Sequence, residues 1–202
     1  MRIIGLTGGI ACGKSNVSSV LRSLGAWIID GDEISRELSA PDGMALPKIR
    51  SAFGDEVFLP DGTLNRKALG SLVFSDRAAR ECLDSIMQPL IKERIINGIT
   101  EAKKAGCPVC ILDMPLLYEK GLDSLCDRVW CVSLPEHLQL SRLMERDGLS
   151  REEALSRMRS QMSASEKAAR AEVVIDTSGP IDYTQSMIPP LYRQELLLDQ
   201  TS

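Results

Sequence analysis

The sequence contains a single histidine, His137, among its 202 residues. His137 follows Pro135 in an expected first helical turn, so we predict that it lies on the surface. Because the chain has no second imidazole, a catalytic mechanism that depends on histidine is disfavoured.

Cysteines are present but lack the arrangement of a metal or redox site. They occupy positions 12, 82, 107, 110, 126 and 131 without regular spacing. Cys107 and Cys110 have the spacing of a half-site, but the chain has no second pair of that spacing. We therefore interpret this pair as buried thiols on a strand rather than as zinc ligands or a redox couple.

The lengths of the apolar runs and the charge balance argue against membrane and nucleic-acid functions. No apolar run approaches the roughly 20 residues that span a bilayer, and the N-terminus enters a predicted strand at once rather than a signal sequence. Lys and Arg number 24 against 28 Asp and Glu, so a net charge of −4 gives no basic excess. We expect a cytoplasmic protein, a monomer or weak homo-oligomer, that binds neither membranes nor nucleic acids.

A phosphate-binding pattern stands near the N-terminus, where residues 8–15 read GGIACGKS. Glycines let successive backbone N–H groups face one concavity, and a following helix adds the positive end of its dipole. Lys14 would reach the β- and γ-phosphates of a nucleotide, and Ser15 would hold Mg²⁺. The alternative is a glycine-rich turn with a chance lysine, which the apolar strand at residues 2–6 disfavours.

Five apolar segments alternate with helical patterns along the chain. They are residues 2–6, 26–29, 109–112, 128–132 and 173–175. This alternation predicts an α/β, three-layer fold with a five-stranded parallel sheet and right-handed crossovers. We expect Gly25 to end the helix that follows the phosphate loop.

The segment between the second and third strands has helices and turns instead of a buried strand. A helix is expected to begin near Ser75, and Pro89 to start or kink the next one. We interpret residues 33–104 as a helical insertion that accepts a second substrate. The chain would then be a single kinase domain, with a nucleotide-binding core of residues 1–32, 105–138 and 169–202.

Residues 139–168 are interpreted as a lid. Gln139, Arg142 and Arg146 recur at helical spacing, so one face presents an amide and two guanidiniums. A capping box at residues 150–153 predicts a second helix, on which Arg157 and Gln161 lie one turn apart. The alternative is a solvated hairpin, but beside a phosphate loop we favour a flap that closes over ATP.

Acidic residues follow two of the predicted strands. Asp30 and Asp32 follow the second, and Asp113 ends the third. Ligands gather at the carboxyl ends of parallel strands, so we expect these acids near the phosphate loop. The alternatives are that Asp32 caps a helix and that Asp113 caps a turn.

These residues together resemble the dephospho-coenzyme A kinase family, a family of P-loop kinases. The resemblance covers nearly the whole chain and is carried by residues 6–10, 13–15, 30–32, 113–119, 139–146, 161 and 174–175. It implies ATP-dependent phosphorylation of the ribose 3′-hydroxyl of dephospho-coenzyme A, the last step of coenzyme A synthesis. ATP would be the co-substrate and Mg²⁺ the metal ion.

The resemblance also implies roles for individual residues. Catalytic roles fall to Asp32 as acceptor of the hydroxyl proton and to Lys14, Arg142 and Arg146. ATP contacts fall to Gly8, Gly9, Ala11, Cys12, Gly13, Lys14, Ser15 and Asn16, with Thr177 and Gly179 at the adenine end. Ser15 would be the metal ligand. Substrate contacts fall to Thr7, Asp32, Gln88, Asp113, Leu116 and Leu117.

The chain departs from the family pattern at four of its positions. Asn16 stands where Thr is usual, Gln88 where His is common, and Glu172 and Thr177 where Asp and Asn are frequent. Gln88 still donates and accepts hydrogen bonds. Two other functions stay open at this point, which are phosphorylation of another small molecule or nucleoside, and nucleotide sensing with little turnover.

Overall fold

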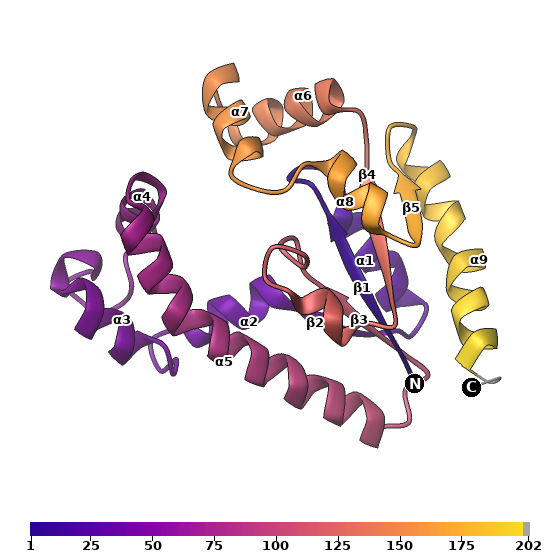
Figure 1. Cartoon of the computed structure of the whole chain (residues 1–202), viewed down its shortest axis with the longest axis horizontal. Coiled ribbons are helices and arrows are strands. Elements are labelled where there is room, and N and C mark those ends of the chain that lie inside the picture. The colour runs from indigo at the N-terminus through magenta and orange to yellow at the C-terminus, as the bar shows by residue number, and fades with distance from the viewer. Residues whose placement is uncertain (200–202) are drawn as a thin grey trace. The chain divides into compact units, whose positions relative to one another are not determined.

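A five-stranded parallel sheet organises the computed structural model, which describes residues 1–199 (Figure 1). Its strands are β1 (Arg2–Gly8), β2 (Trp27–Asp30), β3 (Val109–Asp113), β4 (Arg128–Ser133) and β5 (Val173–Asp176). They are arranged in the order β2-β3-β1-β4-β5. The predicted sheet is therefore confirmed.

The central strand, β1, is enclosed on both faces. Residues 4–8 are all buried, which agrees with the nearly continuous apolar run expected of a strand covered on both sides. Leu6 pairs with Asp113 of β3, and Gly8 pairs with Val132 of β4. The carboxyl ends of these three strands thus meet at one edge of the sheet, where β1 runs into the phosphate loop.

Helices cover the two faces of this sheet. Helix α1 (Lys14–Ser23) contacts β1 and α9 (Ile181–Asp199), and α8 (Ala164–Arg170) packs on β1 and β4. Right-handed crossovers that move in opposite directions along the sheet place α1 and α8 on opposite faces. Val17 and Leu21 of α1 are fully buried one turn apart, and Gly25, with φ 87°, follows the helix end as predicted.

The C-terminal helix α9 has a structural role. It runs through Pro189 and Pro190 and buries Ile188, Tyr192 and Glu195. Glu195 accepts a hydrogen bond from the Arg128 guanidinium at 3.1 Å. Because Arg128 begins β4, this ion pair joins α9 to the sheet.

Two helices follow β4, α6 (Glu136–Asp147) and α7 (Arg151–Arg159). The capping box predicted at the start of α7 is present, since Ser150 Oγ accepts from Glu153 N and the Glu153 carboxylate accepts from Ser150 N. The prediction that Gln161 shares this helix with Arg157 is wrong. A second capping box, between Ser163 and Glu166, starts α8 and requires the chain to leave α7 before that point.

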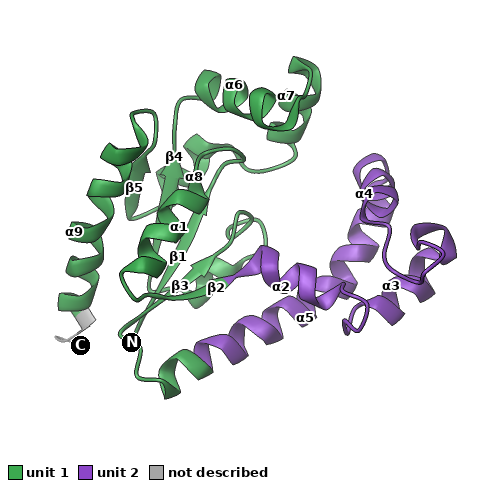
Figure 2. Cartoon of the chain, turned by 180° about the vertical axis from the view of Figure 1, so that it is seen from behind, with its two compact units in different colours: residues 1–29, 101–202 green, residues 30–100 purple. Residues whose placement is uncertain are grey.

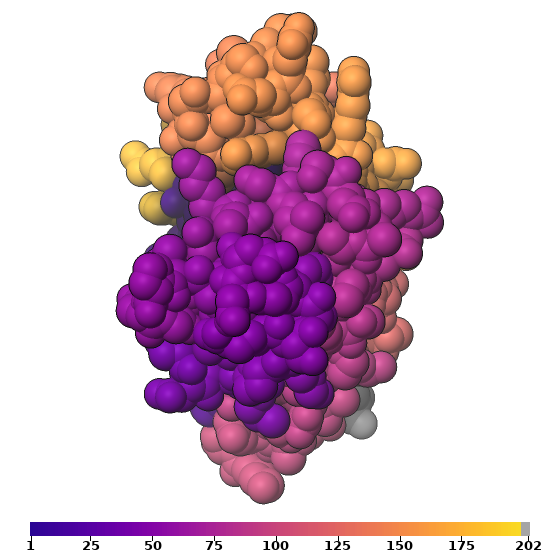
Figure 3. All heavy atoms as spheres, turned by 90° about the vertical axis from the view of Figure 1, so that its left-hand side faces the viewer, coloured from indigo at the N-terminus to yellow at the C-terminus, as the bar shows by residue number. Residues whose placement is uncertain are grey.

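The chain divides into two compact units, residues 1–29 with 101–202 and residues 30–100 (Figure 2). The second unit contains α2 (Gly31–Leu38), α3 (Leu46–Phe53), the short 3₁₀ helix η1 (Asp55–Val57), α4 (Arg66–Ser75) and most of α5 (Arg77–Lys104). Figure 3 shows its surface in purple and magenta. A 3₁₀ turn, η2 (Leu122–Leu125), belongs to the first unit.

Helix α5 begins near the predicted position, but Pro89 does not start a second helix. One helix runs from Arg77 to Lys104 with Pro89 inside it. A proline in a helix interior costs about 3 kcal/mol. Ile91, Ile95 and Ile99 form a buried stripe after it, and their burial outweighs that cost.

The structure also shows where the histidine and the Cys107–Cys110 pair lie. His137 is exposed in the first turn of α6, as predicted. Cys110 is fully buried on β3, whereas Cys107 precedes the strand and is only partly buried. No helix within residues 1–199 has the length and apolar character needed to cross a membrane.

Candidate active site

The phosphate loop connects β1 to α1. β1 ends at Gly8 and α1 begins at Lys14, with Gly13 in the left-handed region at φ 80°. Ala11 also has a positive φ of 59°, which is uncommon outside glycine and is often found where function demands a fixed backbone. The first amides of α1 have no intrahelical acceptor, so this end of the helix is suited to bind an anion.

Two side chains from distant segments hold the carbonyl groups of this loop. Gln139 of α6, which is buried, donates from Nε2 to the Ile10 carbonyl at 2.8 Å. Thr177, just after β5, donates from Oγ1 to the Cys12 carbonyl at 2.8 Å. With its carbonyl groups held by these donors, the loop is fixed before any ligand binds.

Gly9 allows this close approach of helix α6. A Cβ added at Gly9 would lie 2.5 Å from Gln139 Nε2 and 3.1 Å from Cys12 Sγ. Any larger residue would therefore displace the amide that holds Ile10. Gly9 is thus required for packing between loop and lid as well as for backbone freedom.

Lys14 forms an ion pair with Asp113 at the end of β3. Asp113 is almost fully buried, whereas the Lys14 side chain keeps 17% of its surface exposed. The alternative that Asp113 merely caps a turn does not describe this contact. The pair brings together the phosphate loop and the β3 carboxyl end, as the sequence predicted for acids at this edge.

The two lid arginines have different partners. Arg142 Nη2 donates to the Thr177 carbonyl at 2.8 Å, which places it at the β5 loop that also holds the phosphate loop. Arg146 instead bonds to its neighbour Asp147, at 2.8 Å from Nε, and Arg157 binds the same carboxylate at 3.0 Å. The hydrogen bond from Arg146 lowers the pKa of Asp147.

The predicted substrate residues of the first unit differ in how accessible they are. Leu116 is partly exposed, but Leu117 is fully buried, and a Cβ on Gly5 of β1 would lie 2.6 Å from it. Leu117 therefore belongs to the core and presents no surface to a ligand. Thr7 is also fully buried, and its hydroxyl donates to the Pro115 carbonyl at 3.0 Å.

Sequence reasoning missed Lys167 of α8. Its side chain is completely buried, donates to the Pro115 carbonyl and lies 2.9 Å from Glu119 Oε1. The signal was present in the second capping box, because Ser163 and Glu166 fix the start of α8. Lysines are almost always exposed, so the pattern gave no reason to place this one inside.

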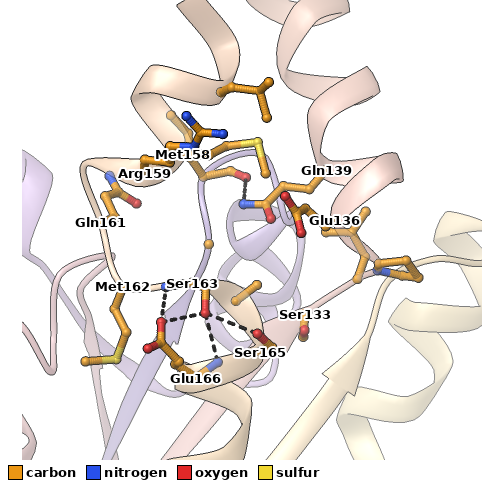
Figure 4. Close-up of a pocket in the computed structure, with 16 residues that line it drawn as sticks. Ser133, Glu136, Gln139, Met158, Arg159, Gln161, Met162, Ser163, Ser165 and Glu166 are labelled. Atoms are coloured by element: carbon orange, nitrogen blue, oxygen red, sulfur yellow. Dashed lines mark hydrogen bonds between the residues drawn. The ribbon is translucent and has the colours of Figure 1, made fainter. Parts of the chain in front are cut away.

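A cavity of about 400 Å³ lies between the phosphate loop, the lid helices and the start of α8 (Figure 4). Its lining combines Gly9 and Ile10 of the loop with residues of α6 and α7, among them Gln139 and Met158. In the close-up, the Gln139 amide reaches the loop across the top of this space. Polar and apolar residues thus line the space beside the loop, which is a combination suited to binding a small molecule.

The predicted residues of the second unit lie on two of its helices. Asp30 caps α2, since its Oδ1 accepts from the amides of Asp32 at 2.8 Å and Glu33 at 3.0 Å. The alternative that Asp32 is the cap is therefore wrong. The Asp32 side chain is exposed in the first turn of α2, and Gln88 is partly buried on α5.

Cys12 is a chemically inert member of the phosphate loop. Only 1% of its surface is exposed, and burial raises the pKa of its thiol to about 11. Burial likewise raises the pKa of Cys110 and of Cys131 to about 12. A thiolate is the reactive form, so these cysteines serve packing.

The fold and the loop define the class of protein. A parallel sheet whose first strand leads through GGIACGKS into a helix is that of a P-loop kinase. The family model described as dephospho-CoA kinase matches residues 2–182.

Individual relatives agree with this match. A dephospho-CoA kinase of Geobacter sulfurreducens is 44% identical over 95% of this chain and 98% of its own length. One of Carboxydothermus hydrogenoformans is 46% identical, covering 92% of this chain and 90% of that protein. The chain belongs to the dephospho-CoA kinase family, as its sequence predicted, and is a phosphotransferase with ATP as its co-substrate.

Solved structures support the fold. The dephospho-CoA kinase of Campylobacter jejuni superposes with a TM-score of 0.65 at 26% identity, covering 96% of this chain and 97% of that one. A Thermus thermophilus protein reaches a TM-score of 0.80 at 32% identity, with the same coverage. The predicted P-loop kinase fold is confirmed.

Thiol labelling tests the rigidity of the loop. At pH 8 the buried Cys12 is neutral, because its pKa is about 11, so iodoacetamide should leave it unmodified in the native protein. Partly exposed Cys82 is the internal control and should react, as measured by peptide mass spectrometry. All six cysteines should react in denaturant. Equal labelling of Cys12 and Cys82 at pH 8 would show that the loop opens freely.

Proposed function

We propose that this protein transfers the terminal phosphoryl group of ATP to the ribose 3′-hydroxyl of dephospho-coenzyme A, giving coenzyme A and ADP. The observation that supports it best is a phosphate loop held by Gln139 and Thr177 in a chain that matches the family over residues 2–182. This is the final step of coenzyme A biosynthesis. Phosphoryl transfer relies on alignment and charge stabilisation, which such a preorganised loop supplies.

The phosphates of ATP would bind the main chain of residues 8–16. Lys14, now paired with Asp113, would turn its ammonium toward the β- and γ-phosphates, because a polyphosphate carries more negative charge than one carboxylate. Asp113 would then contact the incoming substrate. Thr177 and Gly179, in the loop after β5, would border the adenine.

Magnesium fits this site through the nucleotide and not through a protein cage. Within residues 1–199 no group of three or more His, Cys, Asp or Glu side chains is placed to hold a metal ion. Mg²⁺ typically takes one or two protein ligands together with substrate phosphates and water. The exposed Ser15 hydroxyl would be the protein ligand, and the ion would neutralise phosphate charge.

The lid, residues 139–168 in our proposal, would supply positive charge during transfer. Arg142 is held beside the phosphate loop by its bond to the Thr177 carbonyl. A planar guanidinium there can stabilise charge on the transferring group. Arg146 would need to leave Asp147 to do the same, so we assign it the lesser role.

The helical insertion, residues 33–104, would accept dephospho-coenzyme A, and residues 1–32, 105–138 and 169–202 would form the nucleotide-binding core. Asp32 would orient the 3′-hydroxyl and take its proton as the bond to phosphorus forms. Its carboxylate is exposed and, within residues 1–199, has no hydrogen-bond partner, because Asp30 does the capping. Gln88 and Leu116 would add contacts to the substrate.

Substitution of Asp32 tests the proposed base. Asp32→Asn can orient the hydroxyl but cannot accept its proton, so turnover with dephospho-coenzyme A should fall about 10²–10⁴-fold. ATP affinity and the melting temperature should change little. Asp30→Asn is the matched control, because asparagine caps a helix as well as aspartate does, and it should keep its turnover. An Asp32→Asn variant with full activity and a much lower melting temperature would assign Asp32 a structural role.

Substitution of Arg142 tests the lid. Arg142→Ala should lower turnover roughly 10²–10³-fold, the usual loss for one donor to a transition-state oxyanion, and should weaken ATP binding far less. Arg142→Lys should rescue only in part, because a point charge cannot reproduce the planar fork. Arg151→Ala, on an exposed lid position, is the control. Near wild-type turnover in Arg142→Ala would place that arginine on a passive surface.

A further inference from the structure

Stability does not explain why a lysine, rather than a neutral residue, is buried at position 167. Its side chain has 0% exposure. Replacing a buried ion pair by apolar residues of similar volume is often neutral or stabilising, so stability alone does not account for a lysine here. The hydrogen-bond and ion-pair partners of Lys167 indicate its role.

The ammonium group contacts two acceptors of the loop after β3, the Pro115 carbonyl and the Glu119 carboxylate. The Pro115 carbonyl, which accepts from Lys167, also accepts from Thr7 Oγ1 at 3.0 Å, one residue before the phosphate loop. Pro115 lies two residues after Asp113, the partner of Lys14. The loop after β3 is thus tied to β1 on one side and to α8 on the other.

Glu119 completes the connection at the end of the lid. Its Oε1 lies 2.9 Å from Lys167 Nζ and accepts from the Met162 amide, also at 2.9 Å. Met162 stands between α7 and α8 and lines the cavity beside the phosphate loop. One carboxylate oxygen therefore joins the α7–α8 connection to the buried cation.

We propose that Lys167 and Glu119 are positioning residues for phosphoryl transfer, which fix loop 113–119 relative to the α7–α8 connection within the proposed lid. When the lid moves over ATP, Met162 moves with it, and the Glu119–Lys167 pair transmits that displacement to Pro115 and its neighbours Asp113 and Leu116. Lid closure and placement of the acceptor side are then one event. This inference rests on the proposed function for the identity of the acceptor.

Steady-state kinetics and melting of three variants separate positioning from stability. Lys167→Met and Glu119→Gln should each lower kcat roughly 10-fold to 100-fold, the scale of a misplacement of about 1 Å, with little change in KM for ATP. The double variant removes both charges, so it should melt near wild type yet keep the kcat of the worse single variant. Stability is then regained and activity is not.

Arg193→Met is the control, because the exposed Arg193 of α9 bonds to the Pro189 carbonyl of its own helix at 3.3 Å. Its kcat should stay within about twofold of wild type. If Lys167→Met does not fold, kcat and the melting temperature of Glu119→Gln and of the double variant test the proposal in the same way. A double variant with wild-type melting and wild-type kcat overturns the proposal.

Hydrogen exchange gives a readout that does not depend on the acceptor. In the wild-type protein, a non-hydrolysable ATP analogue should slow exchange in residues 160–164 and in residues 113–119 together. In Lys167→Met only residues 160–164 should respond. Independent responses in the wild-type protein would refute the link. Absence of dephospho-coenzyme A phosphorylation with coupled exchange would instead overturn the proposed function and leave the link standing.

Discussion

The site depends on the fixing of the phosphate loop by side chains that come from elsewhere in the chain. Gln139 holds the Ile10 carbonyl from the lid helix, and Thr177 holds the Cys12 carbonyl from the end of β5. A loop with left-handed residues at Ala11 and Gly13 would otherwise sample many conformations. Because its geometry is set before binding, the cost of ordering it is met during folding and does not reduce the affinity for nucleotide.

The same two donors connect the loop to the elements that would move in catalysis. Gln139 and Arg142 are on one helix, and Arg142 bonds to the residue that holds Cys12. The phosphate loop, the β5 loop and helix α6 are therefore joined by hydrogen bonds. On the other side, Lys14 and Asp113 relate the loop to the end of β3.

The features that could be predicted from the sequence are those with a local pattern. The apolar strands, the helix end at Gly25 and the capping box at Ser150 were recognisable from spacing, and the phosphate loop from its motif. The helices through Pro89 and through Pro189 and Pro190 were not, because burial contributed by distant parts of the chain outweighed a local cost.

The site residues that the sequence misplaced or missed have a similar physical explanation. Leu117 and Thr7 were predicted as substrate contacts, but the structure places both inside, where their environment is set by tertiary packing. Lys167 was missed because a buried cation is recognisable only from the acceptors around it, which are a carbonyl of Pro115 and the carboxylate of Glu119. Asp30 and Asp32 are both acids near a helix start, and only the hydrogen bonds distinguish the cap from the free carboxylate.

The most direct measurement of the central claim is ATP consumption by the purified protein with three acceptors, namely dephospho-coenzyme A, adenosine and pantetheine phosphate. The account predicts ADP release in step with consumption of dephospho-coenzyme A, with one phosphate added at the ribose 3′ position, and little turnover of the other two. Comparable turnover of adenosine, or ADP release that does not depend on any acceptor, would contradict it.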